Sequence, residues 1–264
     1  MTGIALASYL ATGALAGILA GLLGIGGGIL IVPVLIFAFS AQGLTAEWVP
    51  HLAIGTSLAT IIGTGATAVY SHHRRGAVRW DLVARLGPGM ILGAWLGAAV
   101  AGLLPEAWLT RVFALFLLIV AARMLGGQAA RASSKLPGTT GLLAVGTGIG
   151  ALSALVGIGG GSLTVPLLVR GGIDMRGAVA TSSGCGLPIA LAGAAGFLVT
   201  GWGREGLPAA ATGFIYWPAV LMVLLTSIPA APLGAHLAHR LPVALLRRVF
   251  GVLLLLVGLR LLMA

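Results

Sequence analysis

Long apolar segments alternate with short polar or glycine-rich breaks along the whole chain. A bilayer core of about 30 Å needs about 20 helical residues, so the longer segments predict transmembrane helices. The apolar segments are Ile4–Leu23, Ile29–Phe39, Leu52–Ser71, Leu82–Leu104, Trp108–Leu125, Leu142–Val156, Leu163–Val169, Val179–Thr200, Phe214–Leu237 and Val243–Met263. The two segments that follow glycine runs, Ile29–Phe39 and Leu163–Val169, are too short to cross a bilayer as helices.

One polar stretch divides the chain. Residues 126–138 contain Gln128, Arg131 and Lys135 and are the only credible linker. The pattern therefore predicts a first membrane repeat at residues 1–125, a cytoplasmic linker at 126–138 and a second membrane repeat at 139–264.

Composition supports a membrane protein. The 264 residues are 59% hydrophobic and 8% charged, with a mean hydropathy of +1.11. A soluble domain has about 25% charged residues, so a soluble enzyme, a disordered chain and a secreted disulfide scaffold are all excluded. The 43 glycines favour closely packed transmembrane helices. The net charge of +10 resides in short arginine clusters between apolar segments, a pattern of membrane orientation rather than of nucleic-acid binding.

Motifs of enzymes and metal sites are missing from the sequence. It contains no H-E-x-x-H, no Walker loop and no G-x-S-x-G with partners, so we expect neither an enzyme nor a bound cofactor or metal. The single cysteine, Cys185, cannot form an intrachain disulfide and is interpreted as a small packing residue. The N-terminus lacks the basic region and cleavage site of a signal peptide, so the first segment is expected to be retained.

The second half of the chain repeats the first. Gly24–Pro33 reads GIGGGILIVP and Gly157–Pro166 reads GIGGGSLTVP, and eight of these ten positions are identical. Gly55-Thr56-Ser57 then corresponds to Ala180-Thr181-Ser182, and Arg111-Val112-Phe113 to Arg248-Val249-Phe250. The same order of motifs in both halves indicates a tandem duplication of one membrane unit.

The distribution of arginine predicts that the two halves face opposite ways. Cytoplasmic loops collect Arg and Lys, which places the loop with Arg74, Arg75 and Arg79 inside and the loop at Pro105 outside. The equivalent loops of the second half, Gly201–Pro208 and the one at Pro242, have the reverse assignment. Inverted repeats require each glycine segment to enter and leave on one face. We therefore predict an all-α polytopic fold of two inverted repeats, each with a broken-helix hairpin and three transmembrane helices. This gives about eight transmembrane elements with both termini outside the cytoplasm.

The two glycine runs are interpreted as helix breaks. Each glycine in a helix costs about 1 kcal/mol relative to alanine, and a broken helix in a membrane is tolerated only inside protein or beside a cavity. Inverted repeats would bring the two breaks together near the bilayer midplane, where many secondary transporters bind substrate. The alternative is that each GxxxG simply lets two helices pack closely.

An exposed helix N-terminus with nearby hydroxyls can hold an anion. Ser162 and Thr164 follow the second glycine run, and the T-S pairs of the two halves correspond to each other. The candidate substrate-binding residues are Gly26, Gly27, Gly28, Thr56, Ser57, Gly159, Gly160, Gly161, Ser162, Thr181, Ser182 and Ser183. The alternative for each hydroxyl is a bond to its own helix backbone.

The charged and titratable residues of the sequence do not identify a coupling ion. No buried carboxylate pair is visible for a proton or sodium ion. His51 and His236 could carry protons or could sit at an interface. Arg123 and Arg260 occupy equivalent positions near helix ends, and whether either reaches the substrate path is left open.

The segments GLLGIGGGILIVPVL and ALVGIGGGSLTVPLLV, each followed by a T-S-rich helix, resemble the TauE/SafE family of sulfite exporter-type membrane proteins. The resemblance implies a multi-pass inner-membrane protein that moves small sulfur-containing anions such as sulfite, sulfoacetate or other organosulfonates. Family members differ in substrate, and Ser183–Gly186 departs from its counterpart Leu58–Ile61, so the two sides of a site would differ. We expect a secondary transporter working by alternating access, with a small anion and the lipid bilayer as partners and no nucleic acid. An anion channel, a non-transporting scaffold subunit and a homo-oligomer remain open.

Overall fold

The computed structural model describes residues 3–23, 28–126, 136–238 and 243–263. The helices are α1 (Gly3–Leu23), α2 (Gly28–Ala41), α3 (Val49–Arg74), α4 (Trp80–Leu103), α5 (Glu106–Leu125), α6 (Thr139–Val156), α7 (Gly161–Arg170), α8 (Met175–Thr200), α9 (Trp217–Ala238) and α10 (Val243–Met263). A 3-10 turn, η1 (Ala46–Trp48), precedes α3. The apolar segments of the sequence therefore form helices, which confirms the predicted all-α polytopic fold. Five of the helices searched, those containing α3, α4, α5, α6 and α8, are long and apolar enough to cross a membrane.

A short β hairpin was not expected. Strands β1 (Ala211–Thr212) and β2 (Ile215–Tyr216) pair antiparallel, so Phe214–Tyr216 precede α9 rather than begin it. The hairpin turns at Gly213, whose φ of +55° favours glycine. A Cβ at Gly213 would also collide with the Leu198 carbonyl oxygen at the end of α8.

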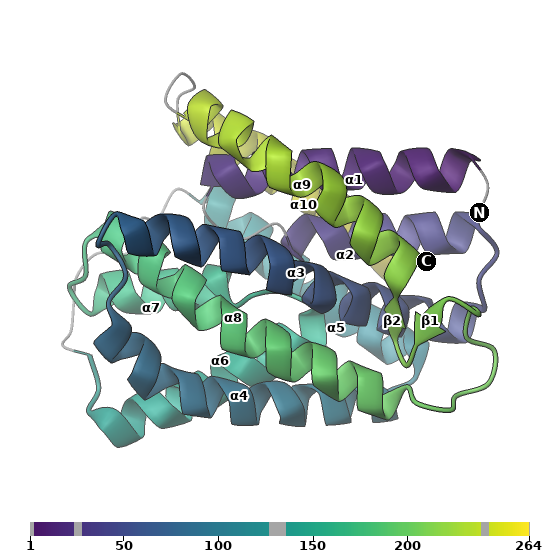
Figure 1. Cartoon of the computed structure of the whole chain (residues 1–264), viewed down its shortest axis with the longest axis horizontal. Helices are drawn as coiled ribbons and strands as arrows, with labels where there is room; N and C mark the ends of the chain where they lie inside the picture. The colour runs from purple at the N-terminus through teal and green to yellow at the C-terminus, as the bar shows by residue number, and fades with distance from the viewer. Residues whose placement is uncertain (1–2, 24–27, 127–135, 239–242, 264) are drawn as a thin grey trace.

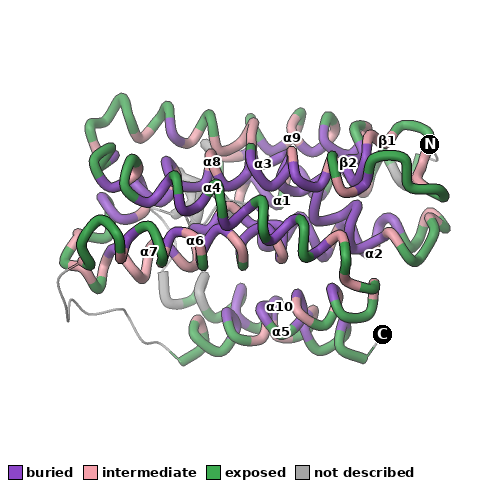
Figure 2. The backbone as a smooth tube through the Cα atoms, turned by 90° about the horizontal axis from the view of Figure 1, so that it is seen from below, coloured by how far each residue is buried: buried purple, intermediate pink, exposed green. Residues whose placement is uncertain are grey.

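The helices run along one common axis (Figure 1). α3 and α8 lie in the middle, α1 packs on α9, α4 packs on α6, and α5 pairs with α10. In Figure 2 the α5–α10 pair lies along one side of the bundle. Large apolar side chains on the outer helices are exposed, such as Leu92 of α4 and Leu225 of α9, which suits contact with lipid hydrocarbon.

Glycines let the outer helix pairs approach closely. On α4, a Cβ at Gly89, Gly93 or Gly97 would collide with a backbone carbonyl oxygen of α6. On α1, Gly13 and Gly17 meet the backbone of α9 in the same way. Part of the glycine excess therefore serves helix packing, as small residues do in membrane proteins.

Two half-helices follow the glycine motifs. α2 has 14 residues and α7 has 10, and the chain between α6 and α7 leaves the helical path. In Figure 1, α1 and α2 enter and leave at the end that bears the β hairpin, whereas α6 and α7 enter and leave at the opposite end. This is the hairpin arrangement that the short segments predict.

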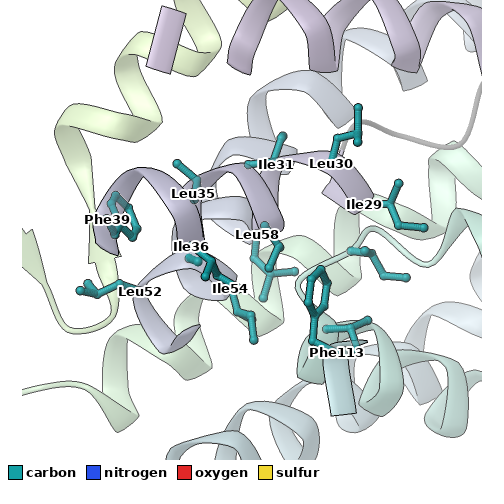
Figure 3. Packing of buried hydrophobic residues seen from close by; sticks show 14 of the residues in the cluster. Ile29, Leu30, Ile31, Leu35, Ile36, Phe39, Leu52, Ile54, Leu58 and Phe113 are labelled. Carbon is teal, nitrogen blue, oxygen red and sulfur yellow. The ribbon is translucent and has the colours of Figure 1, made fainter. Parts of the chain in front are cut away.

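The core forms where the first half-helix meets α3. Every residue from Val49 to Ile61 of α3 is buried. Figure 3 shows Ile36 of α2 beside Ile54 of α3, with Leu58 of α3 and Phe113 of α5 close by. Burying these side chains stabilises each by about 1.5–3 kcal/mol, which holds the half-helix in place although it is too short to span a membrane alone.

Candidate functional site

The second glycine motif is a helix break. Gly157 ends α6 in the left-handed conformation, with φ +69°, and Gly160 adopts φ +73° immediately before α7. Gly161 begins α7. The Leu163 and Thr164 amides donate to the Gly160 carbonyl, which leaves the N–H groups of Gly161 and Ser162, the first two of α7, available to a ligand or to water. The break spans Gly157–Gly160, slightly earlier than Gly159–Gly161 predicted from the sequence.

Three hydroxyls around this break have no hydrogen-bond partner among the described residues. They belong to Ser153, Ser162 and Thr164, and all three oxygen atoms are buried. Ser153 and Thr164 are 0% exposed. A Cβ on Gly160 would lie 3.3 Å from the Ser153 Oγ, which places this hydroxyl beside the residue that starts α7. An unsatisfied buried hydroxyl costs about 1–3 kcal/mol, so these groups call for a ligand or water.

Other hydroxyls in the bundle bond to their own helices instead. Thr60 donates to the Thr56 carbonyl at 2.8 Å, and Thr200 donates to that of Gly196 at 2.9 Å. Ser183, a predicted site residue, donates to the Val179 carbonyl at 3.1 Å. The free hydroxyls around the break therefore differ from the ordinary behaviour of Ser and Thr in membrane helices. We call Ser153, Gly160, Gly161, Ser162 and Thr164 the α7 cradle.

The first motif meets the second at Gly28. Gly26 and Gly27 lie outside the described residues, but Gly28 begins α2. A Cβ at Gly28 would lie 3.1 Å from the Gly157 carbonyl oxygen and 3.2 Å from the Ile158 Cα. The two motifs are thus in contact, and there is no room for a further group between Gly28 and Gly157.

The T-S pair of α3 connects this helix to both the break and the β hairpin. Ser57 Oγ donates to the Gly157 carbonyl at 2.8 Å, and Thr56 Oγ1 accepts from the Tyr216 amide at 3.0 Å. Both side chains are fully buried. Ser57 therefore belongs with the second break, while Thr56 fixes the residue that precedes α9.

The T-S pair of α8 is arranged differently. Thr181 Oγ1 accepts from the Arg79 amide at 3.0 Å, next to the start of α4, and Ser182 is buried. Gly159 contacts α8 further along that helix. A Cβ on Gly186 of α8 would lie 2.8 Å from the Gly159 carbonyl oxygen. The structure thus brings Gly28, Ser57, Gly159, Gly160, Gly161 and Ser162 together. Thr56, Thr181 and Ser183 have other hydrogen bonds.

Ser153 is a member of the cradle that the sequence reasoning missed. It lies four residues before the glycine motif, one helical turn from Gly157, and its counterpart in the first half is Ala20. That asymmetry between otherwise matching halves is the signal that could have identified it.

Two of the charged candidates, Arg260 and His51, contact residues outside the cradle. The Arg260 guanidinium lies over the Phe37 ring, 5.0 Å from its centroid, and Arg123 is exposed. The His236 side chain lies outside the described residues. His51 is 1% exposed and lines an open pocket of about 660 Å³ at the end of the bundle that bears the β hairpin. Within the described residues there is no cluster of three His, Cys, Asp or Glu side chains that could hold a metal ion.

Comparisons with known proteins find similarity to a family of membrane proteins. The family described as sulfite exporter TauE/SafE matches residues 9–261. A probable membrane transporter protein of Haemophilus influenzae is 35% identical over 250 residues, 94% of this chain and 95% of its own length. A probable membrane transporter protein of Xylella fastidiosa is 29% identical over 98% of this chain and 95% of its own. YdhB of Bacillus subtilis, with the same description, is 26% identical over 88% and 90%. No solved structure shows significant similarity to the chain.

Proposed function

The chain belongs to the sulfite exporter TauE/SafE family of multi-pass membrane proteins, and on that premise we propose that it is a secondary transporter of a small sulfur-containing oxyanion. Its relatives are named as membrane transporters, which agrees with the absence of enzyme motifs. We place it in the inner, or plasma, membrane with both termini outside the cytoplasm.

The α7 cradle is the observation on which the proposal depends. Buried hydroxyls of Ser153, Ser162 and Thr164, none with a protein partner among the described residues, lie around a free helix N-terminus. Such a site offers donors and a positive dipole end without a charged side chain. An oxyanion such as sulfite or a sulfonate presents several acceptor oxygens, so its chemistry matches that of the cradle.

Contacts between the halves support inverted repeats and alternating access. α1 and α9 pack in parallel, with Gly13 near Val223 and Gly17 near Ser227. α6 is the counterpart of α1, and α4 is the counterpart of α9. These two helices also pack in parallel. Thr56 accepts from the residue before α9, and its counterpart Thr181 accepts from the residue before α4. Matching contacts of this kind suit two repeats that rock against each other around the break.

Flux measurements in proteoliposomes test the proposal. Labelled sulfite, sulfoacetate and thiosulfate are added to vesicles with the purified protein, and uptake and counterflow are recorded. We expect saturable uptake and counterflow of at least one of these anions. Large unitary currents would indicate a channel instead, and the absence of flux for all three anions would contradict the proposed function.

Substitutions in the cradle link that flux to the site. The double variant Ser153→Ala/Thr164→Val removes two donors, each worth about 0.5–1.5 kcal/mol, and should raise the anion concentration for half-maximal uptake about tenfold or more. Thr147→Ala is the matched control on α6, because Thr147 bonds to the Leu143 carbonyl of its own helix. If the double variant and the control have equal uptake kinetics, the cradle does not bind the transported anion.

A further inference from the structure

The α7 cradle offers hydrogen-bond donors but no charged side chain. Its donors are the hydroxyls of Ser153, Ser162 and Thr164 and the amides of Gly161 and Ser162. The three hydroxyl oxygens are buried. Among the side chains that the structure describes, none that is buried belongs to Asp, Glu, Lys or Arg. An anion in the cradle is therefore held by neutral groups and by the N-terminal end of α7.

The helices around the break carry their charges at their ends. α2, α3 and α8 contact the break between α6 and α7. α2 and α6 contain no charged or titratable residue. On α7 the one charged residue is Arg170, nine residues after Gly161 and about 13.5 Å further along the helix. The charged or titratable residues of α3 and α8 are His51, Tyr70, His72, His73, Arg74, Arg176 and Cys185.

The two arginines of that set lie in terminal turns and are exposed. α4 and α5 pack on α6 and follow the same rule. Their charged residues lie in the first two turns or the last turn of each helix, at Asp81, Arg85, Glu106, Arg111 and Arg123. The centre of the bundle thus contains no fixed counter-ion among the described residues.

The number of negative charges on a ligand determines the cost of burying it there. In the Born description the cost of removing an ion from water grows with the square of its charge, so a dianion costs about four times as much as a monoanion of equal size. The N-terminus of a helix supplies the equivalent of about half a positive charge. This compensates a large part of one negative charge and only a small part of two, and neutral donors add no net charge.

Apolar side chains border the same break. A Cβ on Gly160 would lie 2.7 Å from Ile189 Cδ1 and 3.5 Å from Ile149 Cγ2, and one on Gly159 would lie 3.3 Å from Ile61 Cγ2. The three hydroxyls and two amides suit the three oxygens of a sulfonate or of bisulfite. The fourth position on sulfur is then a carbon group, a lone pair or a hydrogen, which apolar neighbours accept. In sulfate that position is a further charged oxygen.

We propose that the α7 cradle selects singly charged sulfur oxyanions, bisulfite and monosulfonates, over doubly charged ones such as sulfate, thiosulfate and the sulfite dianion. This selection rests on the proposed function, because the cradle is taken as the transport site. Of sulfite, sulfoacetate and thiosulfate, only sulfite has a singly charged form near neutral pH, so we expect its uptake to be the strongest of the three.

The pH dependence of sulfite uptake tests the selection. Sulfite changes from monoanion to dianion near neutral pH, whereas methanesulfonate keeps one charge throughout. Between about one pH unit below and about one above the second pKa of sulfite, the half-saturating concentration of total sulfite should rise about tenfold. That of methanesulfonate should stay within about twofold, which controls for titration of the protein itself. Equal pH dependence of the two anions overturns the inference.

Competition between two tetrahedral anions provides a test at constant pH. Methanesulfonate and sulfate are similar in size and differ in charge. We expect methanesulfonate to inhibit labelled sulfite uptake at a concentration at least about tenfold lower than sulfate does. Inhibition by sulfate as strong as that by methanesulfonate overturns the inference while leaving the proposed function standing.

A charge placed in the cradle should change this preference. Ser162 is only partly buried as a residue, so it can accept a longer side chain. Ser162→Lys supplies the missing positive charge and should lower the preference for methanesulfonate over sulfate about tenfold. Ser162→Gln is the matched control, because it adds similar length without charge and should keep the preference. The same preference in both variants contradicts the role of charge.

Thermal unfolding in detergent measures binding without transport. A ligand that binds only the folded state raises the unfolding temperature. Methanesulfonate should stabilise the wild type more than the double variant Ser153→Ala/Thr164→Val. Sulfate should stabilise both equally, because its effect is that of a salt excluded from the protein surface. If no anion shows flux, the proposed function fails, and the thermal shift alone decides the inference: equal shifts by methanesulfonate in the wild type and the double variant overturn it.

Discussion

Thr56 and Thr181 show how one hydroxyl can join the two halves. Each is buried in a central helix and accepts from a backbone amide at the start of an outer helix from the other half of the chain. Both amides, of Tyr216 and Arg79, precede a helix that begins with tryptophan. The hydroxyls therefore stabilise the structure, whatever part they play in binding an anion.

Thr56→Val should lower the stability of the protein. The substitution keeps the shape of the side chain but leaves the Tyr216 N–H without its acceptor inside the core, at a cost of about 1–3 kcal/mol. Thr56→Ser keeps the hydroxyl and should lose less. The measurement is thermal unfolding in detergent, followed by fluorescence-detected size exclusion.

Thr67→Val is the control for that experiment. Thr67 is exposed and bonds to the Thr64 carbonyl of its own helix, so we expect a change within about 0.5 kcal/mol. If Thr56→Val unfolds at the same temperature as Thr67→Val, the bond to Tyr216 does not contribute to stability.

At the scale of the elements, glycine has two separate tasks. Along α4, glycines at every fourth position remove the side chains that would keep α6 away. At Gly157 and Gly160, glycine allows left-handed backbone that ends one helix and begins another. The sequence alone presents both tasks as the same G-x-x-x-G spacing, and only the neighbours of each glycine distinguish them.

Gly93→Ala should separate α4 from α6. Its Cβ would collide with the Thr147 carbonyl oxygen, a backbone atom that cannot rotate away, so the helices must move apart. Overpacking of this kind costs about 1–3 kcal/mol. The loss should appear as a lower unfolding temperature in the same assay.

Gly148→Ala on α6 separates packing from helix propensity. Nothing lies within 4 Å of a Cβ at Gly148, so alanine there should be neutral or should gain up to about 1 kcal/mol. A destabilisation equal to that of Gly93→Ala would show that close packing of α4 on α6 is not the cause.

The helices could be predicted because each rests on a local pattern. Length and hydropathy locate α3–α6 and α8, and a glycine run followed by a short apolar segment locates α2 and α7. The β hairpin could not be predicted, because Phe214–Tyr216 are apolar and continue into α9 without a break in hydropathy. Their strand depends on the bond from Tyr216 to Thr56, 160 residues away.

The candidate site could be predicted only in part, because some of it depends on contacts between residues that are far apart in the sequence. The free helix end follows from the motif, but whether a hydroxyl bonds to its own helix depends on tertiary surroundings. Ser183 bonds back to Val179, and Ser153 has no such bond. Glu47 and Glu106 line one pocket with His51 only because the turn between α4 and α5 meets η1, a contact that no local pattern predicts.

At the scale of the whole molecule, the two ends of the bundle differ in charge. One end bears Arg74 and Arg75 where α3 ends, Arg170 at the end of α7 and Arg176 at the start of α8. The other bears the β hairpin, with Glu205 and Arg204 in the loop before it. Because basic loops stay in the cytoplasm, the arginine-rich end should face inside and the hairpin end, with the His51 pocket, should face outside.

Cysteine labelling in intact cells measures this orientation. The native Cys185 is fully buried, so the wild-type protein should give little background with a membrane-impermeant maleimide. Glu205 and Arg75 are both exposed and lie at opposite ends of the bundle. Glu205→Cys should react in intact cells, and Arg75→Cys only after the membrane is permeabilised. The opposite pattern would place the His51 pocket in the cytoplasm, and equal labelling of both in intact cells would be incompatible with a bundle that crosses the membrane along its long axis.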